Sequence, residues 1–190
     1  KLNILGEKEF VGKGVAYCAT CDAPLYAGKE VAVVGGGNSA VDAALLLAKI
    51  SPKVHLIHRR GQFRAEHILV DKLKQNPNIE ILLDAEVTEI IGDQFVDKII
   101  VKSQNTTREI PVGGLFVEIG GVVNTAWLNG LVELNQMGEI EIDKLGQTSI
   151  PGLFAAGDAT TIPHKQMVIA AGHGANAALS AYHYIQTLET

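Results

Sequence analysis

Two residues separate Cys18 from Cys21, the only cysteines of the 190-residue chain, and Asp22 follows directly. A Cys-x-x-Cys pair holds two thiols close enough to form and break a disulfide without unfolding, and such thiols often have a lowered pKa. An acidic residue beside the second cysteine can exchange a proton with a thiolate that forms during reduction. In an α/β chain this spacing predicts a redox pair, with Cys18, Cys21 and Asp22 as its catalytic residues.

Two other uses of the cysteines are weaker. A structural zinc site needs four ligands, and the six histidines supply no closely spaced pair near the motif. A pair of thiols with a purely structural role stays open, as does a turn or capping role for Asp22, because "CDAP" is also typical of a turn. We predict no metal site.

A glycine-rich turn follows the apolar run 30–35 and precedes a helical pattern in 40–48. Its spacing matches Gly-x-Gly-x-x-Gly/Ala, and a strand before it with a helix after it is the context that supports nucleotide binding. The first glycine permits the tight turn, the second lets the backbone approach a pyrophosphate, and the small third residue lets strand and helix pack closely. Free N–H groups of the helix then face the phosphates, although a turn without a ligand is the alternative. The residues predicted to bind are Gly35, Gly37, Asn38, Ser39 and Ala40.

The end of the next predicted strand, 53–60, carries His58, Arg59 and Arg60, and Arg64 follows one turn later. An NAD-binding unit usually has Asp or Glu about 20 residues after the glycine turn, where the carboxylate bonds the ribose 2′-hydroxyl. Guanidinium groups at this place instead bind a 2′-phosphate through charge-assisted hydrogen bonds. The sequence therefore favours NADP(H) over NAD(H), with a solvated basic strand end as the alternative.

The order of the predicted elements indicates an α/β fold. Strand, helix, strand, helix and strand follow one another, which is the pattern of a doubly wound nucleotide-binding domain. A second region starts near Pro111 and ends in one long helix rich in small residues. The predicted strands are 30–35, 53–60, 79–91 with a break near Asp84, 97–103, 114–120, 138–143 and 150–160, and the predicted helices are 40–48, 63–76 and 165–187.

The composition is that of a soluble globular protein, with 47% apolar and 19% charged residues. The formal net charge of −5 argues against a nucleic-acid binder, whose footprint is basic. No apolar run reaches the roughly 18 residues needed to span a bilayer, and the chain start lacks the apolar core of a signal peptide. Since the chain does not begin with Met, we expect it to be part of a longer protein. We expect that protein to be cytoplasmic.

A nucleotide site and a redox disulfide together require a third component. A nicotinamide gives two electrons as a hydride, and a flavin mediates between a hydride donor and a disulfide. This points to FAD, and "AAGDATTIPHKQMVIAAG" in the second region supplies a candidate site. A strand that ends in Gly157 and Asp158 would let the carboxylate bond a ribityl hydroxyl. A helix that begins near Lys165, Gln166 and Met167 would aim its N–H groups at the flavin or its phosphates.

The chain closely resembles the low-molecular-weight thioredoxin reductases in five stretches, "CATCDAPLY", "VAVVGGGNSAVDAA", "VHLIHRRGQFRAE", "SIPGLFAAGDAT" and "HKQMVIAAGHGANAALSAY". The resemblance covers essentially the whole chain, in the order of that family. The tail, "EIGGVVNTAWLNGLVELNQMGEIEID" and then "KQMVIAAGHGANAALSAY", resembles the related flavoprotein subunit of alkyl hydroperoxide reductase somewhat more. The arginines and "CATC" are more like thioredoxin reductase, because the peroxidase-linked relatives commonly lack the arginines and use NADH.

This resemblance implies a path for electrons. They would pass from NADPH to FAD, then to the Cys18–Cys21 disulfide, and then to a disulfide of thioredoxin or a thioredoxin-like protein. Cys21 would lie nearer the flavin, Cys18 would attack the partner, and Asp22 would act as acid and base. NADPH would be bound by Gly35, Gly37, Asn38, Ser39, Arg59, Arg60 and Arg64, and FAD by Asp158, Lys165, Gln166 and Met167, the last three standing where bacterial enzymes often have Arg-Gln-Ala.

Members of that family begin with an FAD-domain segment that carries its own Gly-x-Gly-x-x-Gly, and the sequence lacks it. The resemblance therefore implies a Rossmann-like NADPH-binding domain with a parallel sheet and a β-meander in 1–112. Residues 113–190 would be the C-terminal part of a second Rossmann-like, FAD-binding domain. The two domains would rotate against each other, with the chain start and 110–114 as candidate hinges. We expect the chain alone to hold FAD poorly and to be inactive, and the family's homodimer, formed through the FAD domain, to require the full-length protein.

Two other functions fit the same residues. One is a flavoprotein that reduces a peroxiredoxin-linked partner and accepts NADH. The other is a nucleotide-binding module without catalysis, which would bind NADPH whether or not Cys18 is present.

Overall fold

The chain forms two compact units, Lys1–Gly120 and Gly121–Thr190, and each is described by itself. Among the described residues, every helix is too short or too polar to span a bilayer. The computed structural model describes residues 1–104, 106–121, 123–128 and 130–188.

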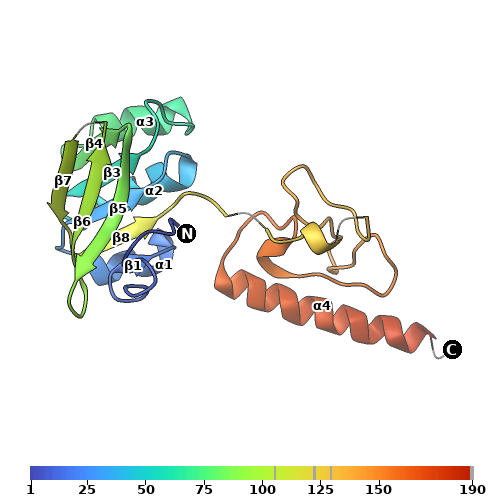
Figure 1. Ribbon diagram of the computed structural model, residues 1–190. Coiled ribbons are helices and arrows are strands. Elements are labelled where there is room, and N and C mark those ends of the chain that lie inside the picture. Colours follow the sequence, from blue (N-terminus) through green and yellow to red (C-terminus); the bar gives the residue numbers. More distant parts are fainter. Residues whose placement is uncertain (105, 122, 129, 189–190) are drawn as a thin grey trace. The chain divides into compact units, whose positions relative to one another are not determined.

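The first unit is built on a five-stranded parallel sheet with the order β1-β8-β2-β3-β4 (Figure 1). β2 and β8 are buried along their whole length, which explains why both are apolar runs without alternation. The strand order reverses beside β2, since β3 and β4 extend the sheet on one side and β8 lies on the other. The strands are β1 (Val15–Ala16), β2 (Val31–Val34), β3 (Val54–His58), β4 (Ile79–Leu83) and β8 (Gly114–Val117).

Helices cover one face of this sheet (Figure 1). Ala40 and Leu47 pack against Phe116 of β8 in a single buried cluster. The third helix begins later than the sequence predicts, because Arg64 donates its backbone N–H to the Gly36 carbonyl (2.7 Å) instead of entering the helix. The helices are α1 (Ala19–Asp22), α2 (Asn38–Leu47) and α3 (His67–Lys74), and a 3-10 turn, Ala23–Tyr26, follows α1.

A three-stranded antiparallel meander covers the other face of the parallel sheet (Figure 1). Its Ile99 and Ile110 share a buried cluster with Ile57 and Leu115 of the parallel sheet. The predicted break at Asp84 is confirmed, because this residue has a left-handed backbone (φ 49°) between β4 and β5. The meander consists of β5 (Ala85–Gly92), β6 (Val96–Ser103) and β7 (Thr106–Pro111).

The division between the units lies at Gly120, not at residue 112 as the sequence predicts. The reason is β8, which pairs in parallel with β1 and β2 and so belongs to the first sheet. The candidate hinge at 110–114 also lies inside the first unit, where Ile110 is buried. The apolar sequence of β8 predicts that both faces of the strand are buried. It does not predict which strands lie beside β8, because β1 and β2 come from distant parts of the chain.

The second unit contains one long helix, α4 (Met167–Leu188), as the sequence predicts. The strands predicted at 138–143 and 150–160 are wrong, because these segments form only isolated bridges, such as Ile140 with Thr160. A strand needs a continuous row of backbone hydrogen-bond partners. In these two segments, the described residues of the unit form only isolated bridges. Two 3-10 turns, Ala126–Leu128 and Gly157–Ala159, and a small core of Leu128, Val132 and Ile140 complete its described part.

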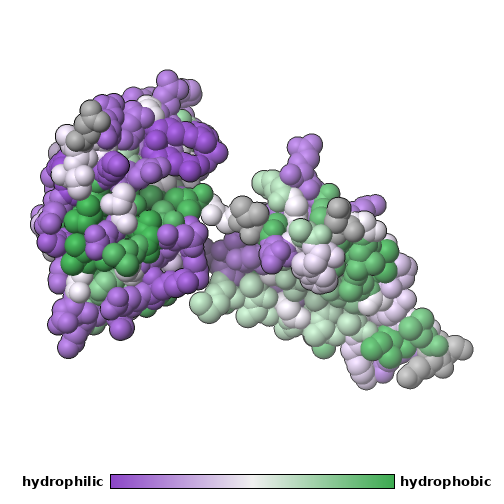
Figure 2. Space-filling model, in the orientation of Figure 1, coloured by the Kyte–Doolittle hydropathy of each residue, from purple (hydrophilic) through white to green (hydrophobic). Residues whose placement is uncertain are grey.

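Apolar side chains reach the surface along α4 (Figure 2). Ala177 is its one buried residue, whereas Met167 and Leu188 are 85% and 67% exposed. The described residues of the second unit therefore cover little of the helix.

One buried carboxylate fixes the start of the chain. Glu7 is 1% exposed and accepts hydrogen bonds from the backbone N–H groups of Leu2 (2.8 Å) and Asn3 (2.6 Å). It also accepts one from the hydroxyl of Tyr17 (2.9 Å), the residue before Cys18. Burial alone would raise the pKa of Glu7, but these hydrogen bonds outweigh it and the pKa is lowered. Burial, and then the contact with Glu7, raises the pKa of Tyr17 to about 12.

We expect Glu7→Ala to lower the free energy of unfolding by about 1–3 kcal/mol, because it leaves backbone donors without their acceptor. The folded-state pKa of Glu7 lies below its ordinary 4.5, so its stabilisation is complete above that pH and is lost as the pH falls through the folded pKa. Urea unfolding at neutral and at acid pH measures both effects, and the deficit should shrink in acid. Glu9→Ala, an exposed carboxylate of the same segment, is the control. An equal loss in both variants would contradict this role.

Candidate functional site

A pocket of about 450 Å³ opens at the carboxyl ends of β2, β3 and β8, where the strand order of the parallel sheet reverses. Ligands of open α/β sheets bind at such a switch point. The glycine turn after β2 forms one wall of it. Among the predicted binding residues, Gly35, Gly37, Ser39, His58, Arg59 and Arg64 line the pocket, whereas Asn38, Ala40 and Arg60 do not.

Close packing shapes the glycine turn. A side chain at Gly35 would place its Cβ 2.3 Å from the Glu118 carbonyl oxygen and 2.6 Å from the Cβ of Ala40, so nothing larger than glycine fits. The close approach to Ala40 agrees with the packing role that the motif predicts for its small third residue. A Cβ at Gly37, the N-cap of α2, would meet nothing within 4 Å. The backbone of Gly37 and the first N–H groups of α2 are therefore open to a phosphate.

The ring of His58 lies against the same turn. A Cβ on Gly36 would be 2.2 Å from this ring, which is buried and stacks on Phe63 at 5.6 Å between centroids. Its Nε2 donates to the Gln62 carbonyl at 3.1 Å. Burial, aided by the charges of the neighbouring arginines, lowers the pKa of His58 and favours the neutral imidazole. His58 thus supports the turn, and its direct contact with a nucleotide stays a prediction.

The three predicted arginines have exposed side chains, and none of them forms an ion pair within the part of the chain that the structure describes. Arg59 and Arg64 line the pocket, whereas Arg60 is not among its lining residues. The backbone bond from Arg64 to Gly36 holds the arginine-bearing loop against the glycine turn. Two guanidinium groups that form no ion pair with another described residue therefore line the pocket.

Asn38 has its side chain engaged with Glu66. The Asn38 amide donates to Glu66 Oε1 (3.1 Å), and its oxygen accepts the Glu66 backbone N–H (2.9 Å). This pair joins the start of α2 to the start of α3. Any contact of Asn38 with a nucleotide stays a prediction.

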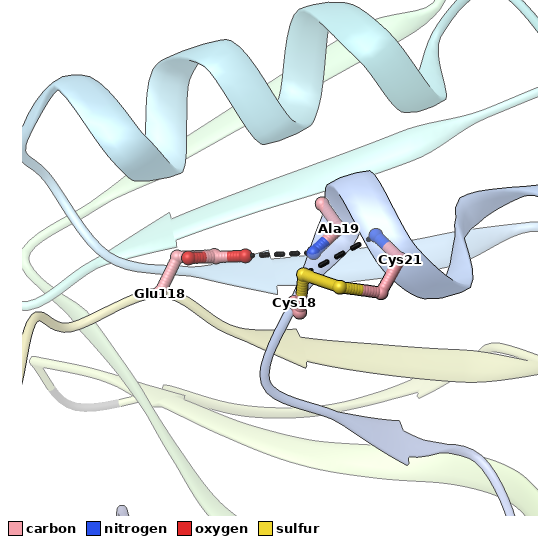
Figure 3. The surroundings of a disulfide bond; sticks show 4 residues. All are labelled: Cys18, Ala19, Cys21 and Glu118. Carbon is pink, nitrogen blue, oxygen red and sulfur yellow. Dashed lines mark hydrogen bonds between the residues drawn. A yellow bond between two sulfur atoms is a disulfide. The ribbon is translucent and has the colours of Figure 1, made fainter. Parts of the chain in front are cut away.

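Cys18 and Cys21 form a disulfide at the start of α1, with their Cα atoms 5.3 Å apart (Figure 3). Cys18 is the N-cap of the helix, and its Sγ accepts the backbone N–H of Cys21 at 3.2 Å. Cys21 is exposed, whereas Cys18 is half-buried. The two sulfur atoms are bonded to each other, and the described residues contain no group of three or more potential metal ligands.

Asp22 ends α1 and is half-buried beside the disulfide. Its backbone N–H donates to the Cys18 carbonyl at 3.1 Å. Burial, and then the negative charge of Asp22, raises the pKa of the Tyr26 hydroxyl. The carboxylate therefore lies near Tyr26, and its exchange of protons with the cysteines stays a prediction.

Glu118 is a residue of the pocket that the sequence analysis did not predict. It follows β8 and lines the pocket, and its Oε1 accepts the backbone N–H of Ala19 at 3.0 Å (Figure 3). Burial raises the pKa of Glu118, and the hydrogen bond from Ala19 offsets part of that rise. The available signal was "LFVEIG", in which one carboxylate ends an apolar strand.

The flavin candidates all lie in the second unit. The Lys165 ammonium is 2.9 Å from Glu139 Oε1 and also donates to the Thr160 carbonyl, so its charge is already matched. The hydrogen bond from Lys165 is the main reason that the pKa of Glu139 is lowered. Asp158 is exposed in the 3-10 turn. Of the others, Gly157 is buried, Gln166 half-buried and Met167 exposed.

The sequence profile described as "Pyridine nucleotide-disulphide oxidoreductase" matches residues 1–178. The chain belongs to this family. An alkyl hydroperoxide reductase component of Pseudomonas putida is 50% identical over 191 residues, which cover 98% of this chain and 37% of that relative. A Bacillus subtilis (strain 168) relative named NADH dehydrogenase is 47% identical, with 97% of this chain and 36% of the relative covered. The chain therefore spans little more than a third of the length of these family members.

Solved thioredoxin reductases of the same fold are also similar to the chain. The enzyme from Streptococcus pyogenes MGAS5005 superposes with a TM-score of 0.92 at 34% identity, over 98% of this chain and 62% of that one. The enzyme from Giardia duodenalis gives a TM-score of 0.86 at 38% identity, with the same coverage. The Rossmann-like α/β fold expected from the sequence is confirmed.

Substitutions at two neighbouring glycines should have different effects, one on stability and the other on nucleotide binding. Gly36→Ala should lower the free energy of unfolding by about 1–3 kcal/mol, because the new methyl overlaps the buried His58 ring. Gly37→Ala should cost less than about 1 kcal/mol, the loss of a glycine N-cap, yet weaken NADPH binding by blocking the approach of the pyrophosphate. Urea unfolding and NADPH titration of both variants measure this contrast. Unchanged NADPH affinity in Gly37→Ala would contradict the assigned phosphate position.

Proposed function

We propose that this chain is the nucleotide-binding and disulfide-bearing part of an NADPH-dependent, flavin-linked protein-disulfide reductase. The observation that carries the proposal is that one unit holds both the Cys18–Cys21 disulfide and a glycine-turn pocket that is lined by Arg59 and Arg64. FAD, when bound, accepts hydride from a nicotinamide and passes two electrons to a disulfide. The net reaction converts NADPH, one proton and a disulfide into NADP⁺ and a dithiol.

The first unit is the proposed NADPH-binding domain. The open backbone at Gly37 and the start of α2 would receive the pyrophosphate. Arg59 and Arg64 would bind the 2′-phosphate, and Arg60 would add charge from outside the pocket. His58 and Asn38 would keep the turn and the arginine loop in place, since both side chains are already bonded within the unit.

The disulfide is the proposed exit for electrons. After reduction, one thiolate attacks a partner disulfide and the other resolves the mixed disulfide. From the family resemblance we assign the attack to Cys18 and the position nearer the flavin to Cys21, with Asp22 exchanging the proton. The second unit would contribute Asp158, Lys165, Gln166 and Met167 to FAD binding. A cytoplasmic homodimer is the expected form of the complete protein.

Arg64→Ala should weaken NADPH binding by about 10- to 150-fold, because a hydrogen bond to a charged group contributes about 1.5–3 kcal/mol. NADH lacks the 2′-phosphate, so its affinity should change by less than about twofold. Equilibrium titration of the chain with both nucleotides measures the ratio. Arg108→Ala is the control, since Arg108 is exposed on β7 and lies outside the pocket lining. Equal losses for NADPH and NADH would contradict the assignment.

A second candidate is a flavoprotein that reduces a peroxiredoxin-linked partner. It is favoured by the names of relatives 46–50% identical to the chain, most of them alkyl hydroperoxide reductase components. The thioredoxin reductases from Streptococcus pyogenes MGAS5005 and Giardia duodenalis are 34% and 38% identical to the chain. The two candidates differ in the partner protein, which is thioredoxin or a peroxiredoxin-linked protein. They also differ in the reductant, because the arginines favour NADPH over NADH.

Turnover of the complete, FAD-loaded protein separates these candidates. We expect NADPH to be oxidised faster than NADH with thioredoxin as acceptor, and Cys18→Ser to abolish this reduction while NADPH binding survives. Faster oxidation of NADH with a peroxiredoxin-linked acceptor would favour the second candidate. Retained disulfide reduction in Cys18→Ser would contradict the role of the cysteine pair in both.

A further inference from the structure

Glu118 touches both functional elements of the first unit. Its side chain accepts the backbone N–H of Ala19, the buried first residue of α1 and the neighbour of Cys18 (Figure 3). Its backbone N–H donates to the Val34 carbonyl at 2.8 Å, immediately before the glycine turn. Its carbonyl oxygen is the atom that a side chain at Gly35 would strike at 2.3 Å.

A merely space-filling role does not explain a carboxylate at this position. The strand it follows is entirely apolar and buried, and burial of a charged group is unfavourable unless a specific partner compensates it. This carboxylate is hydrogen-bonded to the N–H of Ala19, and its other surroundings include the pocket, which Lys1, His58, Arg59, Arg64 and Glu86 also line. The side chain therefore connects the disulfide turn to the nucleotide pocket.

We propose that Glu118 is a positioning residue that couples the redox state of the Cys18–Cys21 disulfide to nucleotide affinity. This inference rests on the proposed function of the pocket and the cysteine pair. Reduction adds two electrons and two protons, breaks the sulfur–sulfur bond and gives two thiols. The covalent link across the first turn of α1 is then lost, only the backbone hydrogen bond from Asp22 to the Cys18 carbonyl still closes that turn, and the N–H of Ala19 can shift. Glu118 follows that N–H and shifts the pocket wall against Gly35.

Such coupling is reciprocal. If the oxidised and reduced chains bind a nucleotide with different affinities, the nucleotide must shift the disulfide equilibrium by the same factor. A tenfold ratio corresponds to about 30 mV for this two-electron couple. NADP⁺ is the suitable probe, because it occupies the pocket without donating a hydride.

The experiment titrates the chain with NADP⁺, first with the disulfide intact and then after reduction by dithiothreitol. The Cys18–Cys21 potential is measured in dithiothreitol redox buffers with and without NADP⁺. For the wild type we expect affinities that differ by about fivefold or more, and a potential shifted by the same factor. A structural role alone would give equal NADP⁺ affinities in the two redox states and no shift of the potential.

Three variants test the contact itself. Glu118→Ala should bring the two NADP⁺ affinities together, whereas Glu118→Gln should preserve their ratio, because its amide oxygen still accepts the N–H. Ala19→Pro removes the donor at the first helical position, where proline is favoured, and Cys18 is already extended (φ −145°, ψ 99°) as a residue before proline must be. It should act like Glu118→Ala. Asp93→Ala, an exposed carboxylate between β5 and β6, is the control.

Equal NADP⁺ affinities in the oxidised and reduced wild type would overturn the inference and leave the proposed function intact. Coupling that survives in both Glu118→Ala and Ala19→Pro would overturn it as well. If Glu118→Ala does not fold, Ala19→Pro decides between the outcomes. A wild type that binds no NADP⁺, or whose disulfide does not equilibrate with dithiothreitol, would overturn the proposed function and the inference with it.

Discussion

The position of β8 between β1 and β2 is the constraint on which both functional elements depend. β1 leads to Cys18 and β2 leads to Gly35, and β8 pairs in parallel with each of them. Parallel strands end at the same edge of a sheet, so the two chain exits and the end of β8 meet there. Glu118 is the first residue after β8. Its backbone therefore lies against the glycine turn, and its side chain reaches Ala19.

The layers on both faces of the parallel sheet leave the carboxyl ends of its strands accessible. Helices bury one face of the sheet and the meander buries the other, so polar groups of the strands are exposed chiefly where the strands end. The meander also reaches the pocket, which Ala85, Glu86 and Val87 of β5 help to line. A ligand at these strand ends would therefore face the glycine turn, the arginines that follow β3, and both apolar and acidic residues of the lining.

The features of the site that could be predicted from the sequence are those set by short-range patterns. The Cys-x-x-Cys pair, the glycine turn and the arginines are each set by spacing within a few residues, and the structure joins the cysteines and brings Gly35, Arg59 and Arg64 to one pocket. The sheet that receives β8, the contact of Glu118 with Ala19 and the failed strands at 138–143 and 150–160 depend on partners far along the chain. No local pattern specifies such partners.

Overall identity and local charge bear on different parts of the function. A relative that is 50% identical to the chain can share its fold and still use another reductant, because function depends on the residues of a site rather than on the fold as a whole. That choice rests on the charge at the end of β3, where a 2′-phosphate is either paired or repelled. Arg59 and Arg64 stand there without ion partners in the described chain. We therefore base the proposed preference for NADPH on the charge at this strand end, and we use the names of the relatives only to propose which protein would receive the electrons.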